Sequence, residues 1–419
     1  MDDITDREQY VKDPRMACKY GPKCYQKNPE HSQKYKHPPP KGPNTKKRTN
    51  NDTEQLAKKF KVDLAPIETD PKEESIETDP KSDDESNINA SPKEAIDSQT
   101  PTVKVRTPKT IPDLHEFIKS YFLVTMPEDF YEFWKLCEKL KKSCPQEAFK
   151  DVGLHLVGPY DVLAGKFCDV ELSEDDFLVH WRFFYDPPEC QTVLKGDDKK
   201  GFHVGYFRDS PKDLPVCLVH NSSKIDGVFT VCGDNIFAAV YIYLENMKKF
   251  GDPFKKMHIG KFQNILKQSM EELKLDCGQK TEKIKSREKK IVARSFSKLG
   301  IVVPYNRKTQ LGYRQLSISN TDLQKMLNDI RKALPEQKPK YLSKLQDILT
   351  NTSIATDECD FGTGIELGLD ILAHGIDSLN VTIARVLATN YRLLDREGFA
   401  KIIEAHMKKR DNGTNLSII

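Results

Sequence analysis

The sequence predicts an α+β protein whose two-domain core follows a small CCHH zinc finger and a disordered linker. Three observations support this fold class. Cysteines and histidines cluster at metal-ligand spacing near the N-terminus, a long Pro-rich and charged stretch with almost no aromatic residues follows, and helical and strand-like apolar patterns begin only after it. Hydrophobic residues make up 37% of the 419 residues and charged residues 31%, a composition that indicates partial disorder.

The predicted finger, residues 13–38, contains four possible metal ligands: Cys18, Cys24, His31 and His37. Two thiolates and two imidazoles complete a tetrahedron around Zn²⁺, and so short a polar segment has no apolar core without the ion. Cys24 and His31 enclose only six residues. A DNA-reading finger needs about twelve there for its recognition helix, so we expect a finger that presents short loops.

The side chains expected beside the metal are Arg15, Tyr20, Tyr25 and Lys27. Aromatic faces combined with cations suit adenine rings and phosphates. In its order of basic, Cys, aromatic-Gly, Cys, His, aromatic and His positions, the segment resembles the poly(ADP-ribose)-binding zinc fingers, departing from them at Gln26. The resemblance implies that poly(ADP-ribose) is the ligand; a purely structural zinc knuckle is the alternative.

Residues 39–110 are predicted to be a disordered linker, because they cannot bury enough apolar surface to order themselves. Within them, Lys46-Lys47 and residues 58–61 have the two-cluster pattern of a nuclear import signal, with a solvated basic run as the alternative. No apolar stretch approaches the roughly 18 residues of a membrane span, and the cysteines outside the finger lack disulfide-scaffold spacing. We expect an intracellular, soluble protein in a reducing compartment with no membrane partner.

The first core domain is expected at residues 111–260. Apolar residues recur at helical spacing from Leu114 to Phe122, and a second helix opens after Pro127. Short apolar runs beginning at Leu154, Phe177, Phe202 and Val216 alternate with turn signals and predict antiparallel strands. A helix capped by Asp234 or Asn235 follows them.

The second core domain is expected at residues 261–419 and is mainly helical. Helical periodicity covers residues 261–275, 321–349 and 365–407. Between the first two of these helical segments, the runs 291–303 and 312–316 predict a short hairpin.

A stretch of the second domain has an unusual charge pattern, since no Lys or Arg occurs between Leu345 and Ala384. Its acidic residues are Asp347, Asp357, Glu358, Asp360, Glu366, Asp370 and Asp377. Acids before a helix often cap it, but three packed beside two glycines repel one another. Helix capping, docking of a cationic partner and catalysis therefore all remain open from the residues alone.

Two further features suggest contact surfaces. The segment from Lys280 to Lys298 carries eight cations in nineteen residues, which suits the phosphates of DNA or a nucleosome surface as well as it suits a solvated helix face. Tyr313 and Arg314 form an aromatic and guanidinium pair of the kind that anchors interfaces.

Six separated motifs between residues 111 and 410 resemble, in order, the histone PARylation factors, accessory subunits of DNA-damage-activated poly(ADP-ribose) polymerases. They are residues 126–135, 156–165, 180–189, 205–211, 312–314 and 357–360. The resemblance implies that the chain is not an enzyme on its own. It implies that the chain docks on the polymerase catalytic domain through Tyr313 and Arg314, with Asp357 and Asp360 seating the partner.

The same resemblance implies that Glu358 is the general base of a joint active site that modifies serine on histones, with NAD⁺ bound by the polymerase. It places the protein in the nucleus, on chromatin at DNA damage sites. A poly(ADP-ribose)-binding adaptor without catalytic contribution is the alternative. A stand-alone ADP-ribosyl hydrolase is a weaker one, because neighbouring residues rarely place two carboxylates about 5 to 9.5 Å apart across a glycosidic bond.

Overall fold

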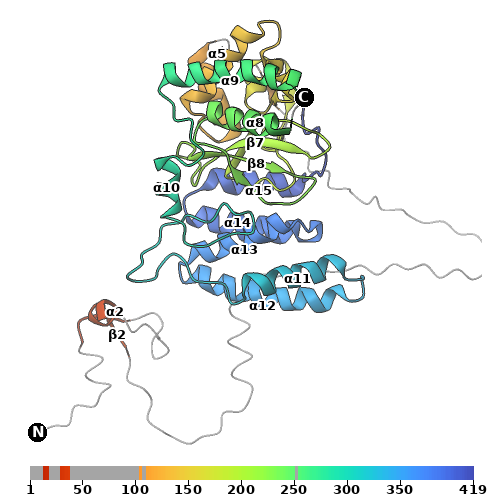
Figure 1. Cartoon of the computed structure of the whole chain (residues 1–419). Helices are drawn as coiled ribbons and strands as arrows, with labels where there is room; N and C mark the ends of the chain where they lie inside the picture. The colour runs from red at the N-terminus through yellow and green to blue at the C-terminus, as the bar shows by residue number, and fades with distance from the viewer. Residues whose placement is uncertain (1–12, 18–28, 38–102, 106–109, 251–252) are drawn as a thin grey trace, which may run out of the picture. The chain divides into compact units, whose positions relative to one another are not determined.

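The computed structural model describes residues 13–17, 29–37, 103–105, 110–250 and 253–419, and the chain divides into two compact units, Met1–Asp97 and Ser98–Ile419. In the first unit the described elements are β1 (Met16–Ala17), α2 (Pro29–Lys34) and β2 (Tyr35–Lys36), of which Figure 1 labels α2 and β2. Strand β1 pairs with β2 in parallel. The predicted import clusters, and the finger residues Cys18, Tyr20, Cys24, Tyr25 and Lys27, lie outside the described residues.

The second unit begins with β3 (Val103–Val105), which falls within the range predicted as linker and pairs antiparallel with β5 (Val170–Leu172). Helices α4 (Ile111–Phe122) and α5 (Glu128–Leu140) form where the sequence predicts them. The central sheet is antiparallel in the order β4-β6-β7-β8-β9. Its strands are β4 (His155–Leu156), β6 (Cys190–Lys195), β7 (Phe202–Phe207), β8 (Cys217–Ser222) and β9 (Thr230–Val231).

Helices α8 (Ile236–Phe250) and α9 (Pro253–Leu273) follow the sheet. The Asn235 side chain accepts a hydrogen bond from the backbone N–H of Ala238, which confirms Asn235 as the cap of α8. The short helix α6 (Tyr160–Leu163) and the 3₁₀ turns Pro145–Glu147 and Lys150–Val152 complete this half of the unit.

The strand predicted to begin at Phe177 is wrong. Glu174–Val179 form helix α7, whose first turn is fixed by a capping box in which the Asp176 carboxylate accepts a hydrogen bond from the backbone N–H of Ser173. The chain then runs irregularly up to β6, and buried side chains satisfy its polar groups. His180 Nε2 lies 2.8 Å from Asp161, and His203 Nε2 lies 2.8 Å from Asp186.

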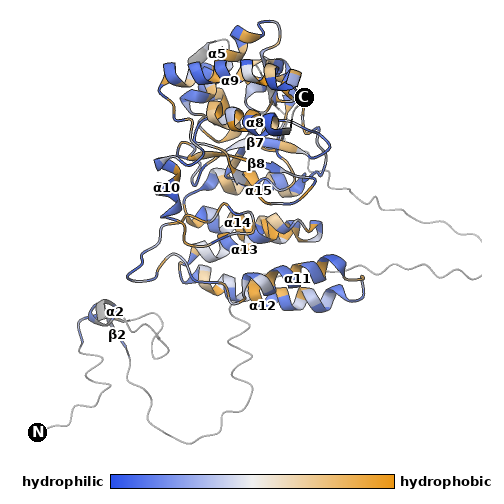
Figure 2. Cartoon of the chain, viewed as in Figure 1, coloured by the Kyte–Doolittle hydropathy of each residue, from blue (hydrophilic) through white to orange (hydrophobic). Residues whose placement is uncertain are grey.

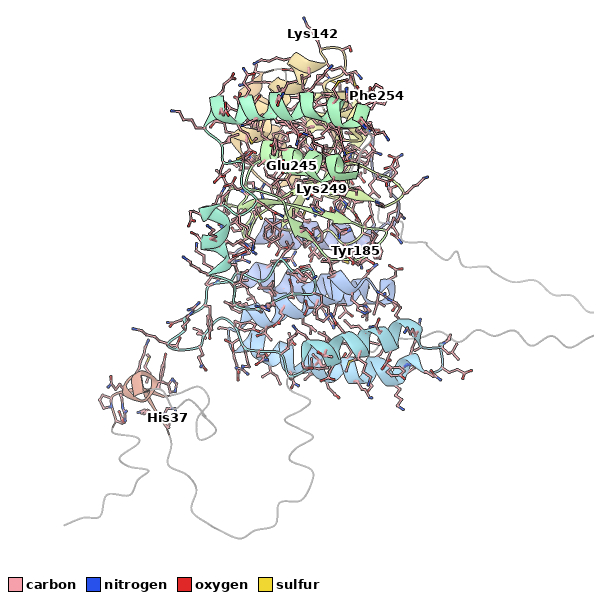
Figure 3. All side chains as sticks on the ribbon, viewed as in Figure 1. His37, Lys142, Tyr185, Glu245, Lys249 and Phe254 are labelled. Atoms are coloured by element: carbon pink, nitrogen blue, oxygen red, sulfur yellow. The ribbon has the colours of Figure 1, made fainter. Side chains whose placement is uncertain are left out.

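The rest of the unit is helical. Its elements are α10 (Glu282–Glu288), α11 (Asn320–Lys332), α12 (Lys338–Asp357), α13 (Phe361–His374), the 3₁₀ turn Asp377–Leu379, α14 (Asn380–Leu393) and α15 (Glu397–Lys408). In Figure 1, α15 lies next to β7 and β8, and α14 and α13 follow it. Helices α11 and α12 lie at the end of the unit that is farthest from the sheet. Figure 3 shows Tyr185 between the sheet and the helices.

The hairpin predicted over 291–303 and 312–316 is wrong as well. Only single bridges occur there, between Ala293 and Ile301 and between Asn306 and Leu311. Side chains take several of the backbone donors that a ladder would use. Ser295 Oγ accepts from the N–H of Gly300 at 3.1 Å, and an aspartate accepts from that of Gly312.

The predicted fold class is confirmed, with a five-stranded antiparallel sheet, covering helices and a helical C-terminal region. Buried apolar residues form one large cluster around α4, α5, α8 and the sheet, and another among α11 to α15. Figure 2 shows α10 mostly in hydrophilic colours, in keeping with its position outside these clusters. The division at residue 260 stays a prediction. No helix within the described residues is long and apolar enough to cross a membrane.

Close approach of α13 and α14 depends on glycine. A Cβ at Gly368 would lie 2.5 Å from Cγ of the buried Leu387, so Gly368→Ala forces the helices apart and lowers the free energy of unfolding by about 1–3 kcal/mol. Gly260, inside α9, has no atom within 4 Å of that position, so Gly260→Ala raises stability by about 0.5–1 kcal/mol. Urea denaturation of both variants measures this, and equal effects would contradict the packing argument.

Candidate functional site

The predicted catalytic and docking residues meet at one joint, where α12 ends and α13 begins. Glu358 occupies the C-cap of α12 and Asp360 the N-cap of α13. Cys359, between them, has φ of 68°, a left-handed conformation that turns the chain sharply. The tight turn therefore holds the acidic residues at the ends of two packed helices, with Asp357 exposed on the last residue of α12.

Asp360 does not cap its own helix. Its side chain makes no cap hydrogen bond, and its Oδ1 instead accepts from the backbone N–H of Gly312 at 3.0 Å. The Gly312 carbonyl in turn accepts from the N–H of Gly362 at 2.9 Å. Gly312 has φ of 109°, and a Cβ there would lie 2.1 Å from the carbonyl oxygen of Pro304. The buried Asp360 therefore fixes the segment 312–314 to the joint.

Arg314 brings the acidic residues together. Its Nη2 forms an ion pair with Oε2 of Glu358 and another, at 3.0 Å, with Oδ2 of Asp360. The hydrogen bond to Glu358 raises the pKa of the Arg314 guanidinium. Carboxylates at the C-terminal end of a helix are disfavoured by the helix dipole, so this cation offsets the repulsion around Glu358. Glu358 remains near the surface, with 20% of its side chain exposed.

Thr363, in the first turn of α13, holds the backbone of Arg314. Its hydroxyl accepts from the N–H of Arg314 at 3.0 Å and donates to the carbonyl of the same residue at 2.6 Å. The backbone of Arg314 is therefore held in place, while 48% of its side chain is exposed. This is a suitable arrangement for a side chain that meets a second protein.

Tyr313 rests on a buried acid. Its hydroxyl donates to Oε2 of Glu366 at 3.0 Å, and Asp370 lies one turn further along α13. Asp370 Oδ1 accepts from the N–H of Phe296 at 2.8 Å, and Asp370 Oδ2 has no hydrogen-bond partner among the described residues. Burial raises the pKa of Glu366 to about 7 and that of Asp370 to about 8.

Sequence reasoning counted Glu366 and Asp370 among the acids of this stretch but gave them no role. The available signal was their spacing. Two carboxylates four residues apart inside an otherwise apolar helix lie on one face, where burial is costly unless they are hydrogen-bonded or protonated. Burial also raises the pKa of the Tyr313 hydroxyl, and the charge of Glu366 adds to the effect.

In the first unit the structure describes two of the four predicted zinc ligands. His31 Nε2 lies 3.1 Å from His37 Nε2. Two imidazoles bound to Zn²⁺ at about 2.0–2.1 Å in a tetrahedron have nitrogens about 3.3 Å apart, so the pair fits two ligand positions. The described residues contain no group of three or more metal-ligating side chains, since Cys18 and Cys24 are not among them. Arg15 forms an ion pair with Asp13 at 2.5 Å.

The basic strip, Lys280 to Lys298, divides into two kinds of cation. Arg287 is buried and paired with Asp209, its Nη2 lying 2.8 Å from Asp209 Oδ1. The other cations of the strip are exposed, and Lys285 forms a surface ion pair with Glu282. Arg287 is therefore part of the fold, and the exposed lysines are the ones available for a ligand.

Comparison with known proteins gives two family matches. A model of the Histone PARylation factor 1 family matches residues 113–410, and a PBZ domain model of CCHH zinc fingers matches residues 15–40. Histone PARylation factor 1 of Bos taurus is 39% identical over 302 residues, which cover 71% of this chain and 87% of that protein. The Danio rerio protein of the same name is 38% identical over 312 residues, covering 73% and 89%. The PBZ match implies zinc binding at the N-terminus.

The buried acids predict a pH dependence. Glu366 and Asp370 bind protons more tightly in the folded chain than in the unfolded one, so their contribution to stability is complete at acidic pH and is lost as pH rises through about 7 and 8. The free energy of unfolding should fall by roughly 2–4 kcal/mol between pH 6 and pH 8. Urea denaturation of Asp370→Asn should show a smaller fall. The exposed Asp395→Asn is the control, and equal pH dependence in both variants would refute the assignment.

The finger predicts one zinc ion per chain. Elemental analysis of the purified protein should give one equivalent, and Cys24→Ala or His37→Ala should lose it, because three remaining ligands hold the ion much more weakly. Cys168→Ala, which alters an exposed cysteine of the second unit, should retain it. Zinc retained after Cys24→Ala would show that the ion binds elsewhere.

Proposed function

Because the chain belongs to the Histone PARylation factor 1 family, we propose that it is the accessory factor of a poly(ADP-ribose) polymerase and supplies the general base for serine ADP-ribosylation of histones. The observation that carries this proposal is the position of Glu358. It lies at the end of a rigid helix, near the surface and directly beside the exposed Arg314. A carboxylate so placed can enter the active site of a docked partner.

The chemistry needs such a group. When nicotinamide leaves the NAD⁺ bound by the polymerase, the ribose gains oxocarbenium character and accepts an oxygen nucleophile. A serine hydroxyl is weakly nucleophilic unless a base removes its proton as the bond forms. In the joint site Glu358 takes that proton, the serine oxygen bonds to the ribose carbon, and nicotinamide leaves with the electrons of the broken bond.

Docking and catalysis would be coupled through Arg314. In the free chain its guanidinium neutralises Glu358 and Asp360 together. If the polymerase offers acceptors to Arg314 and Tyr313, the guanidinium moves toward the partner and Glu358 becomes available to the hydroxyl. Asp360 keeps its bond to Gly312 and holds the segment in place, while Asp357 at the exposed end of α12 faces the partner.

Stand-alone hydrolysis is less well supported. A glycosidase uses two carboxylates facing the substrate, but Asp360 is 5% exposed and engaged with both Gly312 and Arg314. Asp360 therefore cannot act with Glu358 as the second catalytic carboxylate of a hydrolase. An adaptor role without catalysis would give the carboxylate of Glu358, which lies near the surface beside Arg314, no role beyond that ion pair.

The other parts of the chain would target the factor to its substrate. The finger, with Arg15, Tyr20, Tyr25 and Lys27 beside the zinc ligands, would bind poly(ADP-ribose) on chromatin already modified. The exposed lysines between Lys280 and Lys298 would contact nucleosomal DNA. Together these contacts would retain the protein in the nucleus, at DNA damage sites, through the effective concentration that tethered weak sites give one another.

The proposal predicts the effect of Glu358→Gln. With purified polymerase, NAD⁺ and histone acceptor, serine modification should fall by about 10²-fold or more because the base is lost, while binding to the polymerase remains. Glu404→Gln is a matched control, since Glu404 is also a surface helix residue paired with an arginine, Arg392, at 2.7 Å. Full serine modification by Glu358→Gln would exclude Glu358 as the base.

A further inference from the structure

A cleft of about 580 Å³ lies between α10, the turn before β8 and the segment Val302–Pro304. None of the residues predicted for catalysis, docking or zinc binding lines it. Its side chains are Asp209, Ser210, Asp213, Val216, Lys283, Ser286, Arg287, Lys290, Val302, Val303, Pro304 and Arg396. The cleft is therefore a separate feature of the second unit, and its lining indicates what it can bind.

The lining carries excess positive charge. Four cations, Lys283, Arg287, Lys290 and Arg396, face two carboxylates, and the carboxylate of Asp209 is already occupied by Arg287. Arg396 is only 8% exposed, and its Nη2 donates to the carbonyl of Val302 at 3.0 Å. Its Nε and Nη1 have no hydrogen-bond acceptor among the described residues. A buried guanidinium with unused donors at a cleft wall is suited to an anion.

The remaining groups complete an anion site. Lys283 Nζ is held at the cleft by a 2.8 Å hydrogen bond to the carbonyl of Pro215, and Lys290 is exposed at the end of α10. The hydroxyls of Ser210 and Ser286 add two neutral donors. Lysine, arginine and serine donors together are the usual partners of phosphate oxygens.

The composition of the lining favours duplex DNA over a single-stranded or adenine-bearing polymer. None of the lining residues is aromatic, and the apolar ones are valine and proline. Proteins that recognise exposed bases usually stack aromatic side chains on them. In a duplex the bases are stacked inside, so a protein can bind it through contacts with its phosphates alone. Other exposed lysines of the basic strip add positive charge to the same segment of the chain.

We propose that this cleft binds a phosphodiester of duplex DNA, with Arg396 at its wall and Lys283 and Lys290 at its mouth. The proposal deepens the DNA contact assigned above to the basic strip and rests on it. The cleft also lies next to the catalytic joint, because Cβ atoms added at Gly312 and Gly362 would meet Pro304 and Val303 of the same segment. DNA bound there would hold a neighbouring histone tail close to Glu358.

The test uses the full chain with Cys18→Ala, so that the finger does not contribute. Fluorescence anisotropy with a labelled duplex over 50 to 200 mM salt gives the slope of log affinity against log salt. Lys283→Gln with Lys290→Gln should reduce the magnitude of that slope by about 1.8 and weaken binding at 100 mM salt about tenfold, because two phosphate contacts are lost. Lys142→Gln with Lys267→Gln is the control, because both lysines are exposed and neither lines the cleft; Figure 3 labels Lys142 at one end of the second unit.

Lys283 and Lys290 also belong to the basic strip, so Arg396→Gln, which alters a cleft residue outside the strip, separates the two. It should lower the magnitude of the slope by about 0.9 if DNA occupies the cleft, and an unchanged slope would overturn the cleft proposal. If Lys289→Gln with Arg294→Gln lowers the slope and the cleft variant does not, DNA binds the strip alone and the cleft proposal is wrong. If neither variant changes the slope, the DNA contact itself is wrong. A cleft variant that loses poly(ADP-ribose) binding but keeps its DNA slope would also overturn the proposal.

Discussion

The hydrogen bond from the Gly312 N–H to the buried Asp360 is the interaction on which the proposed site depends. It joins a loop to the junction of α12 and α13, which lies almost fifty residues later in the chain. Because the bond fixes the backbone at Gly312, the Tyr313 hydroxyl reaches Glu366 and the Arg314 guanidinium reaches Glu358. Without this bond, the exposed guanidinium of Arg314 and the partly buried carboxylate of Glu358 would not be held together.

That joint is supported by buried polar contacts across the second unit. Tyr391 of α14 donates to Glu189, which precedes β6, at 2.6 Å, and burial raises the pKa of the Glu189 carboxyl. Arg410 stacks over Phe184 and donates to the carbonyl of Leu372 at the end of α13. These contacts link the sheet layer to α13 and α14, and they add hydrogen bonds to the apolar packing there.

The features that local patterns predicted correctly were those that depend on periodicity. Helices α4, α5 and α8 and strands β7 and β8 formed where apolar spacing indicated. The predicted helical segments 321–349 and 365–407 are helical too, but the structure divides them into α11 and α12 and into α13, α14 and α15. The failures at Phe177 and at residues 291–316 share one cause. In both places, side-chain oxygens satisfy backbone N–H groups, so an apolar run did not become a strand. Such competition is set by neighbours in space and is not visible in the run itself.

The sequence by itself determined the chemistry available to the protein: four zinc-ligand candidates in a short polar segment, an acidic stretch free of lysine and arginine, and a strip of cations. Residue type and spacing are local properties of the chain, so they can be identified without knowledge of the fold. Only the tertiary structure decided that Arg314 bridges Glu358 and Asp360, that Glu366 and Asp370 are buried beneath Tyr313, and that Arg396 reaches the cleft beside α10. Those relations join residues dozens of positions apart, and packing brings them together.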